Sequence, residues 1–151
     1  ANGQGFWGDS IQAPIDLINN SDIDYLTLDY LAEITLSIMQ KQKNRNKSLG
    51  YAQDFLDLVS NTANELNNNH IKIITNAGGV NPYCCSTELK NILDKMGVNL
   101  SIGYIEGDDI YDSLDDLIDK GADLSNMDTG DSIDKIKNNI CSVFNILSLR
   151  I

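Results

Sequence analysis

The chain has 151 residues, 42% of them hydrophobic and 22% charged, a composition that excludes a disordered protein and indicates a single globular domain. Its 22 acidic and 11 basic residues give a formal net charge of −11, which argues against nucleic acid or an anionic membrane as partner. No apolar run approaches the ~18 residues that span a bilayer, and three cysteines do not suggest a disulfide framework, so we expect a cytoplasmic protein.

The spacing of apolar residues predicts an alternation of helices and strands. We expect helices over residues 11–19, 31–42, 49–67, 86–96 and 110–120, and strands over residues 23–28, 71–75 and 100–105. A further helix is expected from Ser132 onward, while residues 140–151 fit a helix or a strand equally well. Strands separated by helices indicate a parallel sheet, so the expected fold class is α/β, with a three-layer, Rossmann-like, mostly parallel sheet and flanking helices. Ligands of such folds bind at the carboxyl ends of the strands.

The first segment that could bind a ligand is glycine-rich. Gly3, Gly5 and Gly8 follow the pattern G-x-G-x-x-G just before a helix, where glycines allow backbone N–H groups to approach an anion. Asp29 follows 21 positions after Gly8, near the place of the ribose-binding acid in dinucleotide folds. No strand is expected before these glycines, and the bulky pair Phe6-Trp7 equally fits a turn that packs aromatic side chains.

Two further segments follow predicted strands. Asp29 and Glu33 lie one helical turn apart, where paired carboxylates either bind a hard cation, share acid/base work, or simply begin a helix. The segment Thr75–Pro82 leads from a strand through Gly78-Gly79 to a helix that Asn81 and Pro82 are suited to begin. It predicts either a pocket wall with amide donors or an ordinary strand-to-helix turn.

A fourth segment is strongly acidic. Glu106, Asp108 and Asp109 follow the predicted strand 100–105, and three carboxylates so close together repel one another in a cleft unless a cation or proton lies among them. We therefore consider a divalent metal site here, with a solvated turn before the next helix as the alternative.

These segments together resemble the N-terminal part of the acyclic terpene utilisation family (AtuA-like proteins). The resemblance rests on the motifs Asn2–Asp9, Asp24–Leu26 with Leu28–Glu33, Gly50–Ala52 with Asp54–Phe55, Thr75–Pro82 and Glu106–Asp109, and it covers residues 2–124. It implies a role in the catabolism of citronellol- and geraniol-type compounds, whose intermediates are acyl-CoA thioesters. Family members are considerably longer, so residues 1–151 are expected to form a single α/β domain that is an N-terminal fragment of a longer protein.

We therefore expect a small carboxylate or acyl-CoA substrate, with a divalent metal or CoA as candidate cofactors. Candidate catalytic residues are Asp29, Glu33, Glu106, Asp108 and Asp109, of which Glu106, Asp108 and Asp109 are also candidate metal ligands. Candidate substrate-binding residues are Gly3, Gly5, Phe6, Trp7, Gly8, Asn76, Gly78, Gly79 and Asn81.

The sequence leaves open whether the chain is an enzyme. The alternatives are a dinucleotide-binding domain and a non-catalytic, truncated subunit that works by association. Its expected partners are a small-molecule substrate and either further copies of the chain or the remaining portion of the parent protein.

Overall fold

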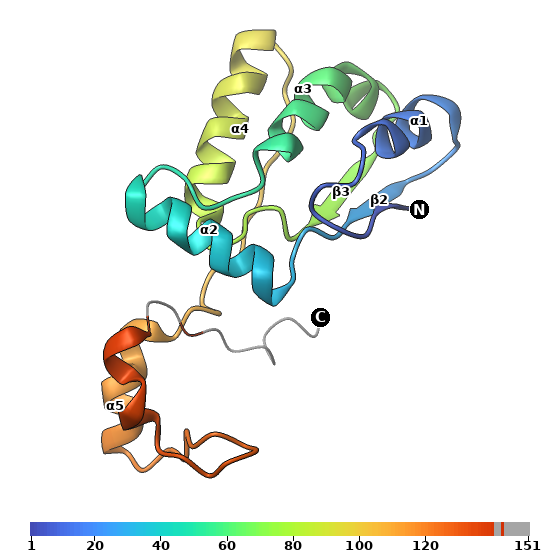
Figure 1. Cartoon of the computed structure of the whole chain (residues 1–151). Helices are drawn as coiled ribbons and strands as arrows, with labels where there is room; N and C mark the ends of the chain where they lie inside the picture. The colour runs from blue at the N-terminus through green and yellow to red at the C-terminus, as the bar shows by residue number, and fades with distance from the viewer. Residues whose placement is uncertain (141–142, 144–151) are drawn as a thin grey trace. The chain divides into compact units, whose positions relative to one another are not determined.

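The computed structural model describes residues 1–140 and residue 143 (Figure 1). Its elements are, in chain order, β1 (Asn2–Gln4), α1 (Gln12–Asn20), β2 (Tyr25–Leu28), α2 (Glu33–Arg45), α3 (Gln53–Asn68), β3 (Lys72–Thr75), α4 (Pro82–Met96) and α5 (Leu114–Asp119). Short 3-10 turns cover Tyr111–Ser113, Ile133–Lys135 and Lys137–Asn139. The expected α/β class is thus confirmed. The chain forms two compact units, Ala1–Ile105 and Glu106–Ile151.

The first unit is built on a three-stranded parallel sheet in the order β1-β2-β3. Tyr25 to Leu28 pair in register with Lys72 to Thr75, and β1 lies on the other side of β2. Because the strands are parallel, the loops that follow all three begin at one edge of the sheet.

Helices pack on one face of this sheet. Helix α1 packs on β1 and on α3, and α3 packs on α4 (Figure 1). The core between them includes Ile18, Leu26, Leu58 and Leu93, each at most 1% exposed. The alternation along β2 follows from the two-residue period of a strand, which sends Leu26 and Leu28 inward toward the helices.

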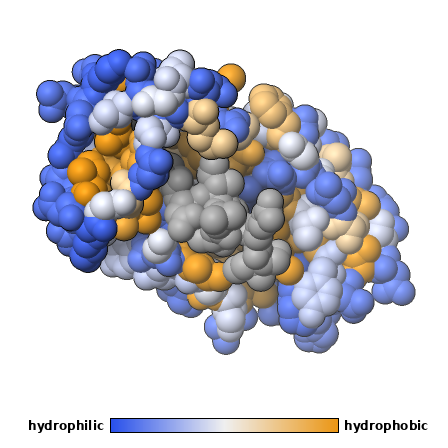
Figure 2. All heavy atoms as spheres, turned by 90° about the horizontal axis from the view of Figure 1, so that it is seen from below, coloured by the Kyte–Doolittle hydropathy of each residue, from blue (hydrophilic) through white to orange (hydrophobic). Residues whose placement is uncertain are grey.

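The opposite face of the sheet is exposed. It carries Tyr25, Thr27, Lys72 and Ile74, of which Tyr25 is 49% and Ile74 59% exposed. The Lys72 ammonium lies 5.0 Å from the centre of the Tyr25 ring, a cation–π contact. Hydrophobic side chains reach solvent elsewhere too, as the orange areas among the blue ones show in Figure 2. The three-layer part of the expected fold is therefore not confirmed.

The prediction of a strand over residues 100–105 is wrong. This segment pairs with no strand of the described chain; the Tyr104 ring instead contacts Tyr83 of α4 edge-on, with 6.1 Å between ring centres. Gly103 lowers the preference for a strand at its centre. Conversely, β1 was not expected, because three residues that include a glycine carry no strand pattern.

Two helices begin at residues other than those predicted, for local reasons. Helix α3 begins at Gln53 rather than near Leu49, because Gly50 has a φ of 109° and turns the chain just before it. Helix α4 begins at Pro82, four residues before the predicted start, with Asn81 and Pro82 in the expected cap and first positions. Gly97, with a φ of 71°, ends α4 as the sequence indicates.

The second unit holds less regular structure. The predicted helix 110–120 divides into the 3-10 turn Tyr111–Ser113 and the short α5, and the helix expected from Ser132 is two 3-10 turns. The expectations for residues 141–142 and 144–151 lie outside the described residues. In the part of the chain that is described, no helix has both the length and the apolar character needed to cross a membrane.

Candidate functional site

The carboxyl ends of β2 and β3 bring two predicted site residues together. Asn76 follows β3, and its side-chain Nδ2 donates a hydrogen bond of 2.7 Å to Oδ1 of Asp29, which follows β2. Oδ1 of Asn76 accepts a 2.7 Å bond from the backbone N–H of Tyr30. Asn76 therefore fixes the position of Asp29 at this edge, as the parallel strands lead one to expect.

The end of β1 joins the same edge. The backbone N–H of Asp29 donates to the carbonyl oxygen of Gln4, at 3.0 Å. The glycine-rich loop then leaves β1, and the backbone N–H of Gly5 donates to Oδ2 of Asp9, at 3.2 Å. The three strand ends and this loop form the candidate site, which lies entirely in the first unit.

The glycines of the G-x-G-x-x-G pattern serve packing and chain turning in this structure. Gly3 is inside β1, and a Cβ on it would approach Leu26 and Pro14 to 3.0 Å, so this glycine allows close packing between strand and helix. Gly8 has a φ of 114°, which a glycine adopts readily. Phe6 is exposed, whereas Trp7 is partly buried and its Nε1 donates to Oδ1 of Asp54, at 3.1 Å.

The donors after β3 are engaged within the protein. Both side-chain bonds of Asn81 run from Nδ2 to backbone carbonyls, those of Lys47 at 2.9 Å and Leu49 at 2.8 Å. A Cβ on Gly79 would lie 2.3 Å from Met39 Sδ and 2.8 Å from the carbonyl oxygen of Gly50. The Gly78-Gly79 turn thus packs tightly against the loop before α3.

The other predicted carboxylates lie in simple surroundings. Glu33 begins α2 and is exposed. In the second unit Glu106 and Asp109 are exposed, and Oδ1 of Asp109 accepts from the backbone N–H of Tyr111, at 3.1 Å. Among residues 1–140 and 143, no three His, Cys, Asp or Glu side chains converge as a metal ion requires. A metal at Glu106, Asp108 and Asp109 therefore stays a prediction.

Three residues near the site were not singled out from the sequence. Burial raises the pKa of the Tyr30 phenol, and the nearby Asp54 and Cys85 raise it further. Burial also raises the pKa of Asp54, although hydrogen bonds from its own backbone and from Trp7 oppose the shift. Gln4, which ends β1, is buried, and its Oε1 has no hydrogen-bond partner among the described residues.

A sequence signal for Asp54 existed. It lies four residues before the buried Leu58, so a carboxylate is placed on the apolar face of an amphipathic helix. Tyr30 carried no such signal, because an aromatic residue after a strand is ordinary core composition.

The adjacent cysteines of α4 differ from each other. Cys84 is partly exposed, whereas Cys85 is 5% exposed and its burial raises the pKa of its thiol to about 12. Such a thiol stays protonated near neutral pH, which does not suit a nucleophile.

An open hollow lies at the other edge of the sheet. It has a volume of about 440 Å³ and is lined by the end of α1 and the residues before β2 and β3, among them Ile18, Asp22 and Ile71. It does not include the polar side chains that gather at the strand ends, so we do not place the site there.

These features define an α/β protein in which a parallel sheet gathers polar side chains at its carboxyl edge. The chain matches the family described as "Acyclic terpene utilisation family protein AtuA" over residues 1–147. The protein belongs to this family, which extends the resemblance seen in its motifs to nearly the whole chain. No curated protein and no solved structure gives a significant match.

Proposed function

We propose that this chain binds a small carboxylate or acyl-CoA substrate at the carboxyl edge of its sheet, in the breakdown of acyclic terpenes. Membership of the acyclic terpene utilisation family supports the class of compound. The single observation that carries the place of binding is the Asn76–Asp29 hydrogen bond of 2.7 Å, which joins the ends of two parallel strands.

In this proposal each side chain has a role that follows from its chemistry. Asp29 and Glu33 are the acid/base candidates of the first unit, and Asn76 orients Asp29. The exposed Phe6 offers apolar surface to a hydrocarbon chain, next to the loop glycines Gly5 and Gly8. Glu106, Asp108 and Asp109 remain the proposed metal or acid/base group of the second unit.

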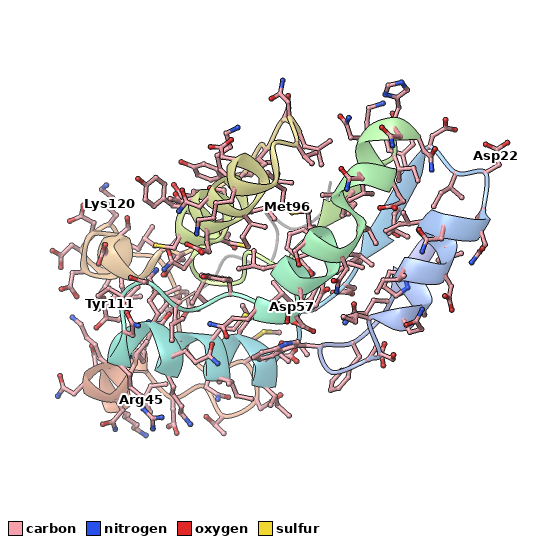
Figure 3. All side chains as sticks on the ribbon, turned by 90° about the horizontal axis from the view of Figure 1, so that it is seen from above. Asp22, Arg45, Asp57, Met96, Tyr111 and Lys120 are labelled. Atoms are coloured by element: carbon pink, nitrogen blue, oxygen red, sulfur yellow. The ribbon has the colours of Figure 1, made fainter. Side chains whose placement is uncertain are left out.

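The proposed site is tested by calorimetric titration with geranate, the carboxylate of a geraniol-type terpene, and with acetyl-CoA. We expect Asp29→Asn and Asn76→Ala to weaken binding at least tenfold, because the first removes the carboxylate charge and the second removes the donor that orients it. The matched control is Asp22→Asn, an exposed aspartate at the opposite edge of the sheet, labelled in Figure 3. Equal affinities of all three variants and the wild type would exclude this site.

The proposed metal is tested separately by thermal melts with Mg²⁺ and Mn²⁺. A metal-dependent rise in melting temperature that is lost in Asp108→Asn supports the carboxylate group. A rise that persists in Asp108→Asn, or no rise at all, refutes the metal proposal.

A dinucleotide-binding domain is the second candidate. It is favoured by the unit β1-α1-β2, in which the two strands are parallel and Asp29 directly follows the second one. Melts with NAD decide between the candidates, since only this second function predicts a rise with NAD that Asp29→Asn abolishes.

Three broader expectations remain proposals. Parallel sheets are usually covered on both faces, which supports a three-layer, Rossmann-like arrangement in which further protein covers Tyr25 and Ile74. That covering protein is either another copy of the chain or the remaining portion of the parent protein. The odd number of cysteines, two of them adjacent, favours a cytoplasmic location.

A further inference from the structure

Trp7 links the glycine-rich loop to the first turn of α3. Its Nε1 donates to Oδ1 of Asp54, at 3.1 Å, and both side chains are partly buried. Asp57, labelled in Figure 3, lies one turn further along the same helix. This hydrogen bond therefore ties the glycine-rich loop of the candidate site to α3.

Tyr30 extends from the strand ends into the protein interior. Its backbone is held by Asn76, and its ring meets Phe55 edge-on, with 6.2 Å between ring centres. Tyr30 is 1% exposed, yet its hydroxyl has no hydrogen-bond partner among the described residues. Buried polar groups in proteins are nearly always paired, so this hydroxyl requires an explanation.

The neighbours of the Tyr30 hydroxyl do not supply that partner. Asp54 and Cys85 lie close enough to raise the pKa of Tyr30, which therefore keeps its proton and can donate a hydrogen bond. The hydroxyl makes no hydrogen bond to Asp54 or to any other described residue, and the protonated Cys85 thiol is a weak acceptor. A carbonyl or carboxylate oxygen is the group that a buried O–H donor of this kind recognises best.

We propose that the buried Tyr30 hydroxyl, whose ring contacts Phe55 of α3, donates a hydrogen bond to the carboxylate or carbonyl oxygen of the substrate. This inference rests on the proposed function and adds Tyr30 to it as a substrate-binding residue. Trp7 bonds to Asp54, which precedes the Phe55 that Tyr30 contacts. Since the sequence contains one tryptophan, its fluorescence is a second readout of binding.

The test compares Tyr30→Phe with the wild type in calorimetric titrations with geranate and with geraniol, which lacks the carboxylate. We expect geranate to bind the wild type more tightly than geraniol does and to change Trp7 emission. Tyr30→Phe is expected to lose at least tenfold in geranate affinity, the effect of one hydrogen bond to a charged group. The control is Tyr25→Phe, on the exposed sheet face, which leaves the affinity unchanged.

Thermal melts of the same variants test whether the hydroxyl is unpaired within the protein. Tyr30→Phe keeps the ring contact with Phe55 and removes an unpartnered polar atom, so it is expected to melt no lower than the wild type. A clear fall in its melting temperature, absent in Tyr25→Phe, means that a protein group accepts from Tyr30 and overturns the inference.

Other outcomes separate this inference from the proposed function. If Tyr30→Phe binds geranate as the wild type does while Asn76→Ala does not, the inference fails and the proposed site stands. If geraniol binds the wild type as tightly as geranate, no carboxylate oxygen is recognised and the inference also fails. If the wild type binds neither geranate nor acetyl-CoA, both proposals fail.

Discussion

The two units of the chain bury apolar surface to very different extents. Residues 1–105 contain the sheet and a core of fully buried side chains, whereas Leu114 is the one buried hydrophobic residue of the second unit among those described. Residues 106–140 carry eleven acidic and three basic residues. The difference teaches that an acidic, Asp-rich sequence forms turns and short helices, because it has too few apolar residues to build its own core.

The test with the largest expected effect replaces one core leucine in each unit by alanine. Leu58→Ala, at a position that is 0% exposed, is expected to lower the free energy of unfolding by roughly 3 kcal/mol through a cavity beneath α3. Leu114→Ala, in the smaller core of the second unit, is expected to cost clearly less. Urea unfolding followed by circular dichroism measures both, and equal losses contradict the contrast between the units.

A second test compares a packed glycine with an open one. Gly79→Ala brings a Cβ against Met39 and Gly50 at a φ of 54°, so a loss of about 2 kcal/mol is expected. Gly121 has a φ of 82°, but a Cβ added to it would contact no residue beyond its chain neighbours within 4 Å. The expected loss for Gly121→Ala is therefore only about 1 kcal/mol, from backbone strain. Thermal melts of the two variants should differ in that order, and the reverse order speaks against the packing described for Gly79.

A third test concerns the pH dependence of stability that Asp54 contributes. The folded-state pKa of Asp54 is raised, so the folded protein binds more protons than the unfolded chain and loses stability as the pH rises through that window. Asp54→Asn is expected to match the wild type in acid, where both side chains are neutral. At pH 7 it should be more stable by no more than about 1 kcal/mol, since part of the side chain is solvated.

Urea unfolding of Asp54→Asn at pH 4 and pH 7 measures this difference. Asp22→Asn, at an exposed position, is the control and should show no comparable change. A wild type that exceeds Asp54→Asn in stability at pH 7 means that the carboxylate is favourable where it lies, contrary to the pKa shift.

The smallest effects are expected from the surface ion pairs of the two units. Lys90 and Asp94 of α4 are 2.7 Å apart, and Lys137 pairs with Asp115 in the second unit. Both pairs are well exposed to solvent, where water and salt screen the attraction. Lys90→Ala and Lys137→Ala should both leave the midpoint of thermal unfolding nearly unchanged; a large fall in either would show a structural role that exposure does not suggest.

Sequence reasoning succeeded where apolar periodicity is strong. It placed strands at β2 and β3 and helices at α1 to α4 because Leu26, Leu58 and their neighbours repeat with the period of each element. It missed β1, whose pairing with β2 comes from the tertiary fold and not from its three residues. It also predicted a strand over residues 100–105 that no neighbouring strand supports.

The candidate site was predicted in part for similar reasons. Asp29 and Asn76 meet because parallel strands end at one edge, a rule that needs only the order of elements. Tyr30 meets Phe55 of α3, next to Asp54, through tertiary packing, which a sequence does not specify locally. The roles expected for Glu33, Glu106, Asp108 and Asp109 stay predictions.

The adjacent cysteines at the start of α4 have a practical consequence. Successive residues of a helix point about 100° apart, so Cys84 faces outward while Cys85 is enclosed, and burial holds its thiol in the unreactive, protonated form. An alkylating reagent should therefore modify Cys84 well before Cys85. A spectroscopic label can thus be attached to the α4 surface while the neighbouring sulfur is left untouched.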